Sequence, residues 1–314
     1  MIKKICNYLF NKPADLGVAI LVRLSAIFPD KLYLKLMFRL KMGYWMDFDN
    51  PKTFSEKIQW LKLYNRKPEY TQMVDKYQAK KYVASIIGEK YIIPTLGVWD
   101  KFDDIDFSKL PDKFVLKTTH GGGNTGVVIC KDKSTFDIVA AKKKINRSLK
   151  QDIYINLREW PYKNVRKRII AEQFIETKDY QDLPDYKFYC FNGEPQYCQV
   201  IRGRNTIETI DFYDMEWNHM PFVGLTPVVR NGLPPVVRNG LTPVVRPQYL
   251  TNMVHICRKL AVGIPFCRVD LYIVNDEVYF GEITFFPASG LGVFDPSEWN
   301  NELGKMIELT HKTM

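Results

Sequence analysis

Residues 264–292 read IPFCRVDLYIVNDEVYFGEITFFPASGLG. Apolar residues alternate with other residues on both sides of Asn275-Asp276, and this pattern predicts a β-hairpin with a tight turn. Asp270 falls inside the first strand and Glu282 inside the second, where an unpaired carboxylate is costly to bury. Two carboxylates at facing positions of one hairpin form a hard-oxygen site of the kind that Mg²⁺ occupies beside substrate phosphates.

Arg268 adds a positive charge to this predicted site. It precedes Asp270 by two residues and therefore points to the same face of the strand. A cation beside two carboxylates is the arrangement that phosphoryl chemistry requires. Taken alone, the hairpin fits equally well with a buried ion network of Arg268, Asp270 and Glu282 that is only structural. The rest of the chain decides between these interpretations.

The totals describe a globular protein with an excess of positive charge. With 314 residues, of which 46% are apolar, the chain is long enough for one large domain or two with an ample core. The formal charge of +10 favours anionic partners, which include nucleotides, acidic glycans and membrane surfaces. Basic residues are scattered and no nucleic-acid motif is present, so no nucleic-acid partner is expected.

Cysteine usage indicates a reducing compartment. The six cysteines include no C-x-x-C pair, and we therefore expect free thiols and a cytoplasmic location. No apolar run reaches the roughly 18 residues of a membrane span. The cysteines are Cys6, Cys130, Cys190, Cys198, Cys257 and Cys267.

Residues 1–70 predict an N-terminal helical extension. Apolar positions within 18–27, and again within 32–40, each fit one face of a helix. Residues 1–48 carry eight Lys/Arg against three Asp/Glu. We favour an extension that packs on the body of the protein. The alternative is a basic amphipathic surface that makes a peripheral contact with the inner face of an anionic membrane.

A glycine-rich loop follows a strand that carries a lysine near its end. Phe114–His120 predicts the strand, Gly121–Gly126 the loop and Val127–Cys130 the next strand. Backbone N–H groups of such a loop can approach anionic oxygens closely, and Lys117 would bring a positive charge to the same place. Because no helix follows, the loop is neither a Walker loop nor a dinucleotide-binding loop.

Other segments complete the predicted body. Helices are expected from Asp75-Lys76, over 134–150 and over 296–312. The strand 168–175 is apolar and runs into a linker, which suits a slot where backbone groups read the edge of adenine. Asn192-Gly193 joins two further strands as a hairpin turn.

Residues 225–248 repeat with a period of eight residues, as LTPVVRNG, LPPVVRNG and LTPVVRPQ. Pro and Gly at this frequency favour an extended or turning surface loop over the interior of a sheet. We favour a duplication that lengthens such a loop, because insertions in loops cost little. The alternative is a basic strip of Arg230, Arg238 and Arg246 over an acidic substrate.

The order of these parts resembles the ATP-grasp superfamily. The resemblance rests on AEQFI at 171–175, DYK at 185–187, Arg268-Val-Asp270 and Glu282-Ile-Thr284, after the strand-end lysine and glycine loop. FSEKIQWL at 54–61, DYKFYCFNG at 185–193 and FGEITF at 280–285 look more narrowly like its TupA-like branch, named for teichuronopeptide biosynthesis. The resemblance covers roughly residues 50–310.

This resemblance implies an α+β fold in which two subdomains grip ATP behind the N-terminal extension. Residues 71–113 would form the first ATP-grasp portion and 114–175 the glycine-loop subdomain that covers the nucleotide. Residues 176–314 would form the C-terminal subdomain, with the repeat as a loop.

The resemblance also implies roles for single residues. The phosphates would be contacted by Lys76, Lys117, Lys187 and a loop containing Gly121, Gly122, Gly123 and Gly126. The adenine would lie against Glu172, Gln173, Phe174 and Ile175, and the ribose hydroxyls against Asp185. Mg²⁺ would be carried by Asp270 and Glu282, with Thr284 where many relatives have Asn.

The expected activity is that of a carboxylate–amine ligase that forms an amide through an acyl phosphate. Arg268 and Lys187 would act on the reacting groups. The resemblance suggests that an amino acid or other amine is joined to a uronic-acid component of a bacterial surface polysaccharide such as a capsule. One alternative is an ATP-grasp kinase for a sugar or acid. The other is a non-catalytic assembly protein that binds glycan or membrane.

Overall fold

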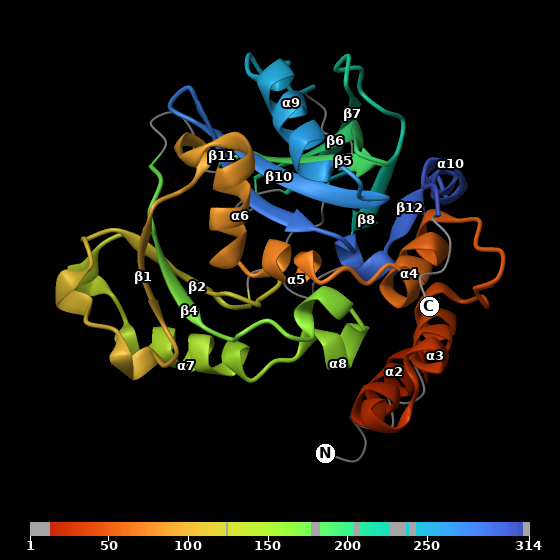
Figure 1. Ribbon diagram of the computed structural model, residues 1–314, viewed down its shortest axis with the longest axis horizontal. Coiled ribbons are helices and arrows are strands. Elements are labelled where there is room, and N and C mark those ends of the chain that lie inside the picture. The colour runs from red at the N-terminus through yellow and green to blue at the C-terminus, as the bar shows by residue number, and fades with distance from the viewer. Residues whose placement is uncertain are drawn as a thin grey trace.

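The computed structural model describes residues 13–123, 125–176, 183–203, 208–226, 237–238 and 243–309. Two sheets, each accompanied by helices, form the body, and a group of N-terminal helices lies against one end of it (Figure 1). This α+β architecture with an N-terminal helical extension is the fold expected from the sequence.

The N-terminal helices begin with α2 (Pro13–Arg23), the 3₁₀ turn η1 (Ser25–Ile27) and α3 (Asp30–Met42). The next helix, α4 (Phe54–Tyr64), begins with a capping box. The Thr53 side chain accepts from the backbone N–H of Glu56, and the Glu56 carboxylate accepts from the N–H of Thr53. This reciprocal pair fixes the start of α4.

Two helices lie between the sheets in Figure 1, α5 (Glu69–Val74) and α6 (Gln78–Ile87), and η2 (Glu89–Tyr91) follows them. The helix expected from Asp75-Lys76 therefore begins three residues later than predicted, at Gln78. Asp75 sits before it and accepts the backbone N–H groups of Tyr77 and Gln78. Gly88, at φ +104°, ends it.

The smaller sheet has the strand order β1-β4-β2-β3 and is antiparallel throughout. Its strands are β1 (Thr95–Trp99), β2 (Phe114–Thr118), β3 (Val127–Cys130) and β4 (Ile169–Gln173). Strand β1 precedes residue 114, where the sequence placed the start of this subdomain. Helix α7 (Ile138–Leu149) covers the sheet and is capped by Asp137, so it is shorter than the 134–150 predicted.

The larger sheet has the order β11-β10-β5-β6-β7-β9, and α9 (Leu250–Ala261) packs on one face of it. The hairpin predicted within residues 264–292 is β10 with β11. The strands are β5 (Asp185–Phe191), β6 (Glu194–Arg202), β7 (Thr209–Asp214), β9 (Val237–Arg238), β10 (Phe266–Val274) and β11 (Glu277–Thr284). A separate pair joins β8 (Val223–Thr226) to β12 (Val293–Asp295).

The remaining elements are short. They are η3 (Phe102–Asp104), η4 (Phe107–Lys109), η5 (Lys133–Thr135), α8 (Ile153–Leu157), η6 (Trp160–Tyr162), η7 (Pro287–Gly290) and α10 (Trp299–Lys305). Helix α10 is shorter than the final helix predicted over 296–312. Most of the repeat at 225–248, including Arg230 and the side chain of Arg238, lies outside the described residues, and Arg246 is exposed.

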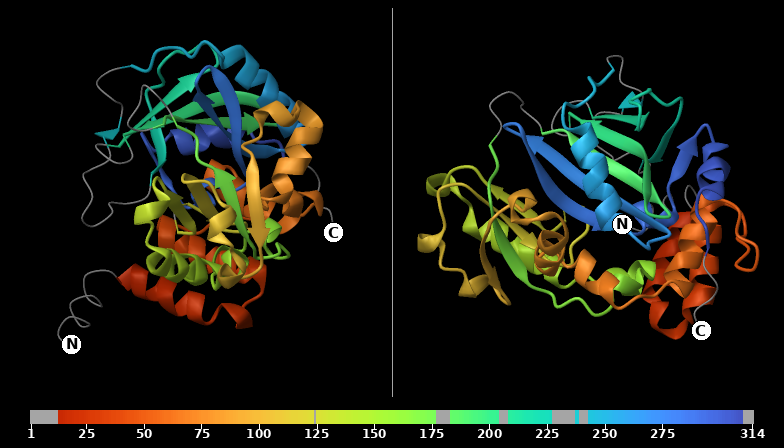
Figure 2. Two further views of the ribbon diagram at one scale, coloured as in Figure 1. Left: turned by 90° about the vertical axis from the view of Figure 1, so that its left-hand side faces the viewer. Right: turned by 45° about the horizontal axis from the view of Figure 1, so that its top comes forward.

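The two sheets meet along the edge strand β11. Ile92 forms an isolated bridge with Phe280, and the backbone N–H of Gln173 donates to the carbonyl of Pro94. On the other side, the side chain of Asn275 donates to the carbonyl of Glu176. Figure 2 shows from two further directions how β10 and β11 come down beside the smaller sheet. The chain that follows β4 therefore lies next to the turn of the hairpin.

The described cysteines are buried free thiols, as expected, and Cys6 lies outside the described residues. Within the described part of the chain, no helix has the length and apolar character that crossing a bilayer requires.

Candidate functional site

Asp270 and Glu282 face each other across the β10–β11 hairpin, as the sequence predicts. They are partners in the antiparallel ladder, beside a bulge between Asp270 and Leu271. Arg268 and Thr284 are partners two residues away. Because side chains alternate between the faces of a strand, these four side chains emerge on one face of the larger sheet.

The turn of the hairpin sets this register. Asn275 and Asp276 both have positive φ, 48° and 65°, which is the backbone of the two-residue turn favoured between antiparallel strands. Asn and Asp tolerate this conformation better than most residues. A one-residue slip would turn Asp270 or Glu282 to the opposite face, so the turn chemistry positions the candidate site.

Arg268 joins the acidic side chains together. Its guanidinium donates to both oxygens of Asp270, at 2.6 and 2.8 Å, and to Glu282 Oε1 at 3.1 Å. The same nitrogen lies 3.1 Å from Thr284 Oγ1. Burial opposes the charge of Arg268, but the carboxylates outweigh it and hold its pKa above the usual value. Arg268 is therefore a permanent, fixed cation at the hairpin.

Lys187 approaches Asp270 from the neighbouring strand β5, where the two residues are ladder partners. Its ammonium pairs with Asp270 Oδ2 and lies 4.0 Å from a carboxylate oxygen of Asp185. The Asp270 side chain is only 2% exposed, so both of its oxygens are occupied by cations of the chain itself. Asp270 consequently anchors Arg268 and Lys187.

Glu282 is the more accessible of the two carboxylates, with 37% of its side chain exposed. Burial would raise its pKa, but the charges of Lys76, Arg268 and Lys187 outweigh burial and lower it well below the usual range. Lys76 donates to Glu282 Oε2 at 2.9 Å. Burial alone would lower the pKa of Lys76, yet Glu282 raises it. This pair is fully ionised at neutral pH.

Lys76 reaches the hairpin because its backbone is held from both sides. Its N–H donates to the carbonyl of Thr119, at the end of β2, at 2.9 Å. The preceding residue, Asp75, is fully buried and accepts from Arg168 at 3.0 Å. The Asp-Lys dipeptide thus joins the start of α6 to two strands of the smaller sheet.

Glu172 forms a second charged centre, on β4. Lys117 Nζ lies 2.5 Å from Glu172 Oε2, and Lys80 Nζ lies 2.7 Å from Oε1. Burial would raise the pKa of Glu172, but these two lysines outweigh it and lower the pKa to about 2. Lys80 was missed from the sequence. The signal available was its spacing of four residues from Lys76, because both lysines then fall near one end of α6.

The glycine loop packs closely against the end of β2. A Cβ on Gly121 would lie 2.4 Å from Thr118 Oγ1, and one on Gly126 would lie 2.2 Å from the same atom. Gly123 has φ +56° and open space around it, and Gly122 has only Ile153 within 4 Å. Close packing on Thr118 therefore explains the glycines at 121 and 126, and positive φ explains the one at 123. Neither constraint applies at Gly122.

His120 points into the interior beside this loop. It is buried, and its Nε2 lies 3.1 Å from the carbonyl oxygen of Ser148. Burial lowers the pKa of its imidazole, and Lys167 adds to this effect. His120 therefore belongs to the packing of the smaller subdomain rather than to its charged surface.

The predicted adenine linker begins at the end of β4. Gln173 is the last residue of that strand and is exposed, and Phe174 and Ile175 follow it as partly buried residues. The bond between Asn275 and the carbonyl of Glu176 ties the linker to the turn of the hairpin. The linker thus spans the edge between the two sheets, next to Glu172.

A buried lysine supports the far end of β11. Lys62, on α4, donates to the carbonyl of Ser289 at 2.8 Å and to its hydroxyl at 2.6 Å. Burial lowers the pKa of Lys62 to about 8, and nearby Glu159 opposes this effect. Ala288 and Ser289 have positive φ, so this turn is strained and is held by the lysine. The contact fixes the chain directly after Thr284.

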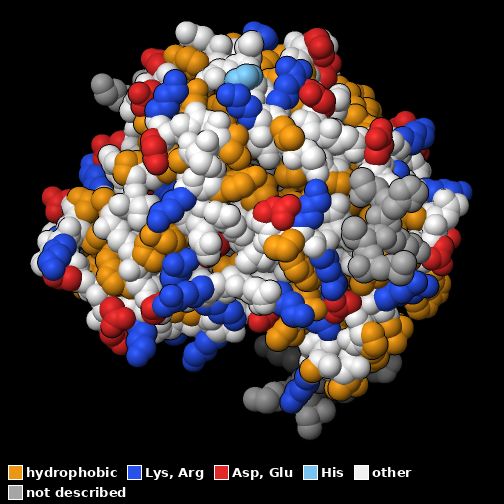
Figure 3. Space-filling model, viewed as in Figure 1, with side chains coloured by type: hydrophobic (Ala, Val, Ile, Leu, Met, Phe, Trp, Pro, Cys, Tyr) orange, Lys and Arg blue, Asp and Glu red, His pale blue; other side chains and the backbone are white. Residues whose placement is uncertain are grey.

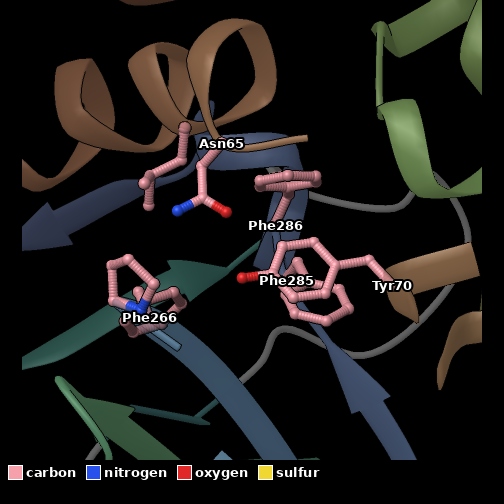
Figure 4. Close-up of a pocket in the computed structure, with 7 residues that line it drawn as sticks. Asn65, Tyr70, Phe266, Phe285 and Phe286 are labelled. Carbon is pink, nitrogen blue, oxygen red and sulfur yellow. The ribbon is translucent and has the colours of Figure 1, made fainter. Parts of the chain in front are cut away.

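An internal cavity behind the hairpin does not contribute to the candidate site. Figure 4 shows the rings of Tyr70, Phe285 and Phe286 around it, with Asn65 opposite. Tyr70 stacks on Phe285 with the ring centroids 4.1 Å apart. The cavity volume is about 10 Å³, which is water-sized and far too small for a nucleotide.

The oxygen atoms of the hairpin suit a Mg²⁺ ion in their chemistry. Glu282 and Thr284 place a carboxylate and a hydroxyl 3.3 Å apart on an accessible face, and Mg²⁺ binds through one or two carboxylates together with phosphates and water. Asp270 is less suited because its side chain is only 2% exposed, although both carboxylates are paired with cations of the chain. No cluster of three or more His, Cys, Asp or Glu able to hold a metal occurs among the described residues.

One family of known proteins matches most of the chain. The model of the family described as TupA-like ATPgrasp matches residues 56–308, which include every candidate residue named above. A search of curated proteins found no match.

Solved structures with a similar arrangement are distant in sequence. The D-alanine–D-alanine ligase of Helicobacter pylori is 15% identical, with 81% of this chain and 69% of that chain covered and a TM-score of 0.42. An ATP-grasp RimK domain protein of Sphaerobacter thermophilus is 11% identical, with coverages of 78% and 70% and a TM-score of 0.40. The D-alanine–D-alanine ligase of Bacillus anthracis complexed with ATP is 14% identical, with coverages of 76% and 68% and a TM-score of 0.37.

Proposed function

Because the chain belongs to the TupA-like ATP-grasp family, we propose that it is an ATP-dependent carboxylate–amine ligase. The product would be an amide, formed through an acyl phosphate, with ADP and phosphate released. The observation that carries this proposal is a cluster of ion-paired side chains, hereafter the charged cluster, on the two sheets and at the start of α6. It contains five cations and four carboxylates, which are Lys76, Lys80, Lys117, Lys187 and Arg268 with Glu172, Asp185, Asp270 and Glu282.

This arrangement suits the binding of a nucleotide triphosphate. The side chains carry one more positive charge than negative charge, and every cation is already held by a carboxylate of the chain. These cations are already held in place, so little rearrangement is needed before they contact phosphate oxygens. Such preorganisation is the main source of electrostatic catalysis. Lys117 and Lys80 beside Glu172 would lie nearest the nucleotide, while Lys76, Lys187 and Arg268 would lie nearest the reacting phosphate.

Mg²⁺, when bound beside Glu282 and Thr284, would neutralise charge on the transferred phosphoryl group. The remaining work falls to the chain. Arg268 and Lys187 would hold the substrate carboxylate so that one of its oxygens attacks the γ-phosphorus, while the bond from that phosphorus to the oxygen of ADP breaks. The amine nitrogen then attacks the acyl carbon, loses a proton to water or buffer, and inorganic phosphate leaves.

The proposed substrates rest on the family and not on the residues of the site. We infer from the family that the acid is a uronic-acid component of a bacterial surface polysaccharide and that the amine is an amino acid. The formal charge of +10 supports an acidic glycan precursor without identifying it. We also propose a cytoplasmic location, where ATP is available.

The test is ADP release from Mg-ATP with a panel of uronic acids and a mixture of amino acids, with product masses measured alongside. We expect ADP only when both an acid and an amine are present, and a product that weighs the sum of the two minus one water. Glu282→Gln should lower the rate by about 10²-fold or more. Glu277→Gln is the matched control, because Glu277 lies on the same strand and is exposed.

A phosphorylated sugar or acid formed without any amine would replace the ligase with a kinase. Binding of glycan without any interaction with Mg-ATP would instead favour the non-catalytic assembly protein. Either result would reject the ligase.

A further inference from the structure

The outer side of the first helices carries a stripe of exposed apolar side chains. Leu16 and Ile20 on α2, Leu24 directly after it and Ile27 in η1 are 36%, 50%, 44% and 71% exposed. The four-residue spacing of Leu16 and Ile20 places them on one side of α2, and Leu24 and Ile27 continue the exposed apolar series into η1. Leu32, at the start of α3, is also exposed and extends the stripe across the turn. A helix that only packs on the protein would carry polar residues here.

The helix α2 already has a separate inner face. Leu21 is buried and forms a small cluster with Tyr33 and Met37 of α3, and Val18 and Val22 pack against it. The outer stripe is therefore not needed for folding of the helix pair. Exposed large apolar residues gathered in this way mark an interaction surface rather than a scattered background.

Positive charges surround the stripe. Arg23 lies within it, three residues after Ile20, and Lys31, Arg39 and Lys41 are exposed on α3. In Figure 3, orange and blue side chains gather at the lower right, over the region where Figure 1 places α2 and α3. Long basic side chains of this kind keep their charges at the surface while their stems lie along apolar neighbours.

The acidic residues of α2 and α3 do not cancel these charges at the surface. Asp30 is occupied from within the protein by Arg66 at 2.6 Å and by Arg158 at 3.0 Å. The Asp15 carboxylate lies 3.8 Å from Lys41 Nζ and offsets the charge of Lys41 but not the other positive charges. Arg23, Lys31 and Arg39 therefore remain to attract an anionic partner.

We infer that the surface formed by Leu16, Ile20, Arg23, Leu24, Ile27, Lys31 and Leu32, hereafter the stripe surface, docks on an anionic lipid bilayer. Apolar side chains would enter the boundary between headgroups and acyl chains, and the basic side chains would pair with lipid phosphates. A second copy of the chain fits less well, because a symmetric contact through the stripe would bring Arg23 and Lys31 against their own counterparts.

The stripe surface is rigidly attached to the body of the protein. Tyr33 donates to the carbonyl of Asn156 at 2.7 Å, and Arg158 donates to the carbonyl of Phe28 and pairs with Asp30. These contacts join the first helices to the segment Ile153–Tyr162, which leads into β4. Docking would therefore orient the whole molecule, and the charged cluster with it, relative to the bilayer. This inference does not depend on the ligase activity.

The test measures sedimentation of the full chain with vesicles of phosphatidylcholine alone or mixed with phosphatidylglycerol. We expect binding to the anionic vesicles, weakened by salt, and little binding to the neutral ones. Replacing Ile20 and Leu24 together by Glu should lower the partition coefficient by about tenfold or more. Arg23→Gln should lower it by about fivefold.

Matched controls replace apolar residues elsewhere that are more exposed than Ile20 and Leu24. Val139→Glu and Val262→Glu alter residues that are 78% and 74% exposed, and should leave binding within about twofold. Thermal unfolding of each variant checks the fold. Deletion of residues 2–12 tests whether the preceding segment, rather than the stripe surface, makes the contact.

Three results would overturn the inference. The first is equal binding by the wild type and the Ile20→Glu, Leu24→Glu variant. The second is loss of binding on deletion of residues 2–12 alone. The third is a dimer that the same double variant dissociates, measured by light scattering, together with no binding to anionic vesicles.

Discussion

Asp270 and Glu282 are ladder partners on one hairpin, yet they have different surroundings. Each is engaged by two cations, but the Asp270 side chain is 2% exposed and the Glu282 side chain is 37% exposed. The buried carboxylate therefore only positions its cations, whereas Glu282 reaches solvent and could exchange a cation partner for a metal ion. This division of roles gives the variants of the site distinct expected outcomes.

Removing Arg268 should destabilise the protein. Arg268→Ala leaves Asp270 buried with Lys187 as its remaining cation, and loss of one partner from a buried ion pair costs about 3 kcal/mol. Arg268→Lys should retain charge but lose the two-point contact, and so cost less. Urea unfolding measures both. The control is Arg258→Ala, whose pairing with Glu194 is exposed and should be worth about 1 kcal/mol or less. Equal losses of unfolding free energy in Arg268→Ala and Arg258→Ala would contradict this prediction.

Lys80 should belong to the nucleotide site, although the sequence did not single it out. We expect Lys80→Met to raise the KM for ATP about tenfold, since it removes one charge-assisted contact beside Glu172. Lys81→Met, an exposed neighbour, should leave the KM unchanged. Steady-state ADP formation gives both values. A Lys80 variant with unchanged KM but lower resistance to urea would make the residue structural.

Glu172 should make stability depend on acid pH. Its pKa is lowered from 4.5 to about 2 by Lys117 and Lys80 against the effect of burial, so the unfolded chain takes up a proton at a higher pH than the folded protein does. The contribution is complete above about pH 5 and is lost as the pH falls from about 4.5 to about 2, by about 3 kcal/mol. Urea unfolding at several pH values measures it. Glu172→Gln should remove this part of the acid dependence, and a variant with the wild-type slope would refute the assignment.

Two glycines of the loop should behave differently. Gly126→Ala places a Cβ within 2.4 Å of the Thr118 and Ser148 hydroxyls, and we expect a loss of about 1–3 kcal/mol in unfolding free energy. Gly122→Ala meets only Ile153 at 3.8 Å and should leave stability nearly unchanged. Thermal unfolding compares the two. Equal effects would mean that packing on Thr118 does not explain the glycine at 126.

The sequence could predict the hairpin because its signals are local. Alternation of apolar residues gave β10 and β11, and the Asn275-Asp276 turn fixed the register that brings Asp270 opposite Glu282. The family resemblance supplied the larger arrangement, which the match to residues 56–308 supports. Local pattern and resemblance together were enough to predict that Asp270, Glu282 and Arg268 lie side by side.

Features that depend on distant contacts could not be predicted in this way. Lys80 acts through Glu172, on a strand far along the chain, and β1 joins the smaller sheet only by pairing with β4. The anchoring of Asp30 by Arg158 likewise joins segments with no sequence relationship. In each case the partner is set by tertiary packing, which periodicity does not report.

The most direct test of the ligase follows oxygen from the acid. An acid that supports ADP release is labelled with ¹⁸O in its carboxylate and incubated with the amine and Mg-ATP, and the released phosphate is examined by mass. Attack of the carboxylate on the γ-phosphorus followed by amide formation predicts that one labelled oxygen moves into the phosphate. Phosphate without label, with amide still formed, would contradict the acyl-phosphate route that this structure is proposed to catalyse.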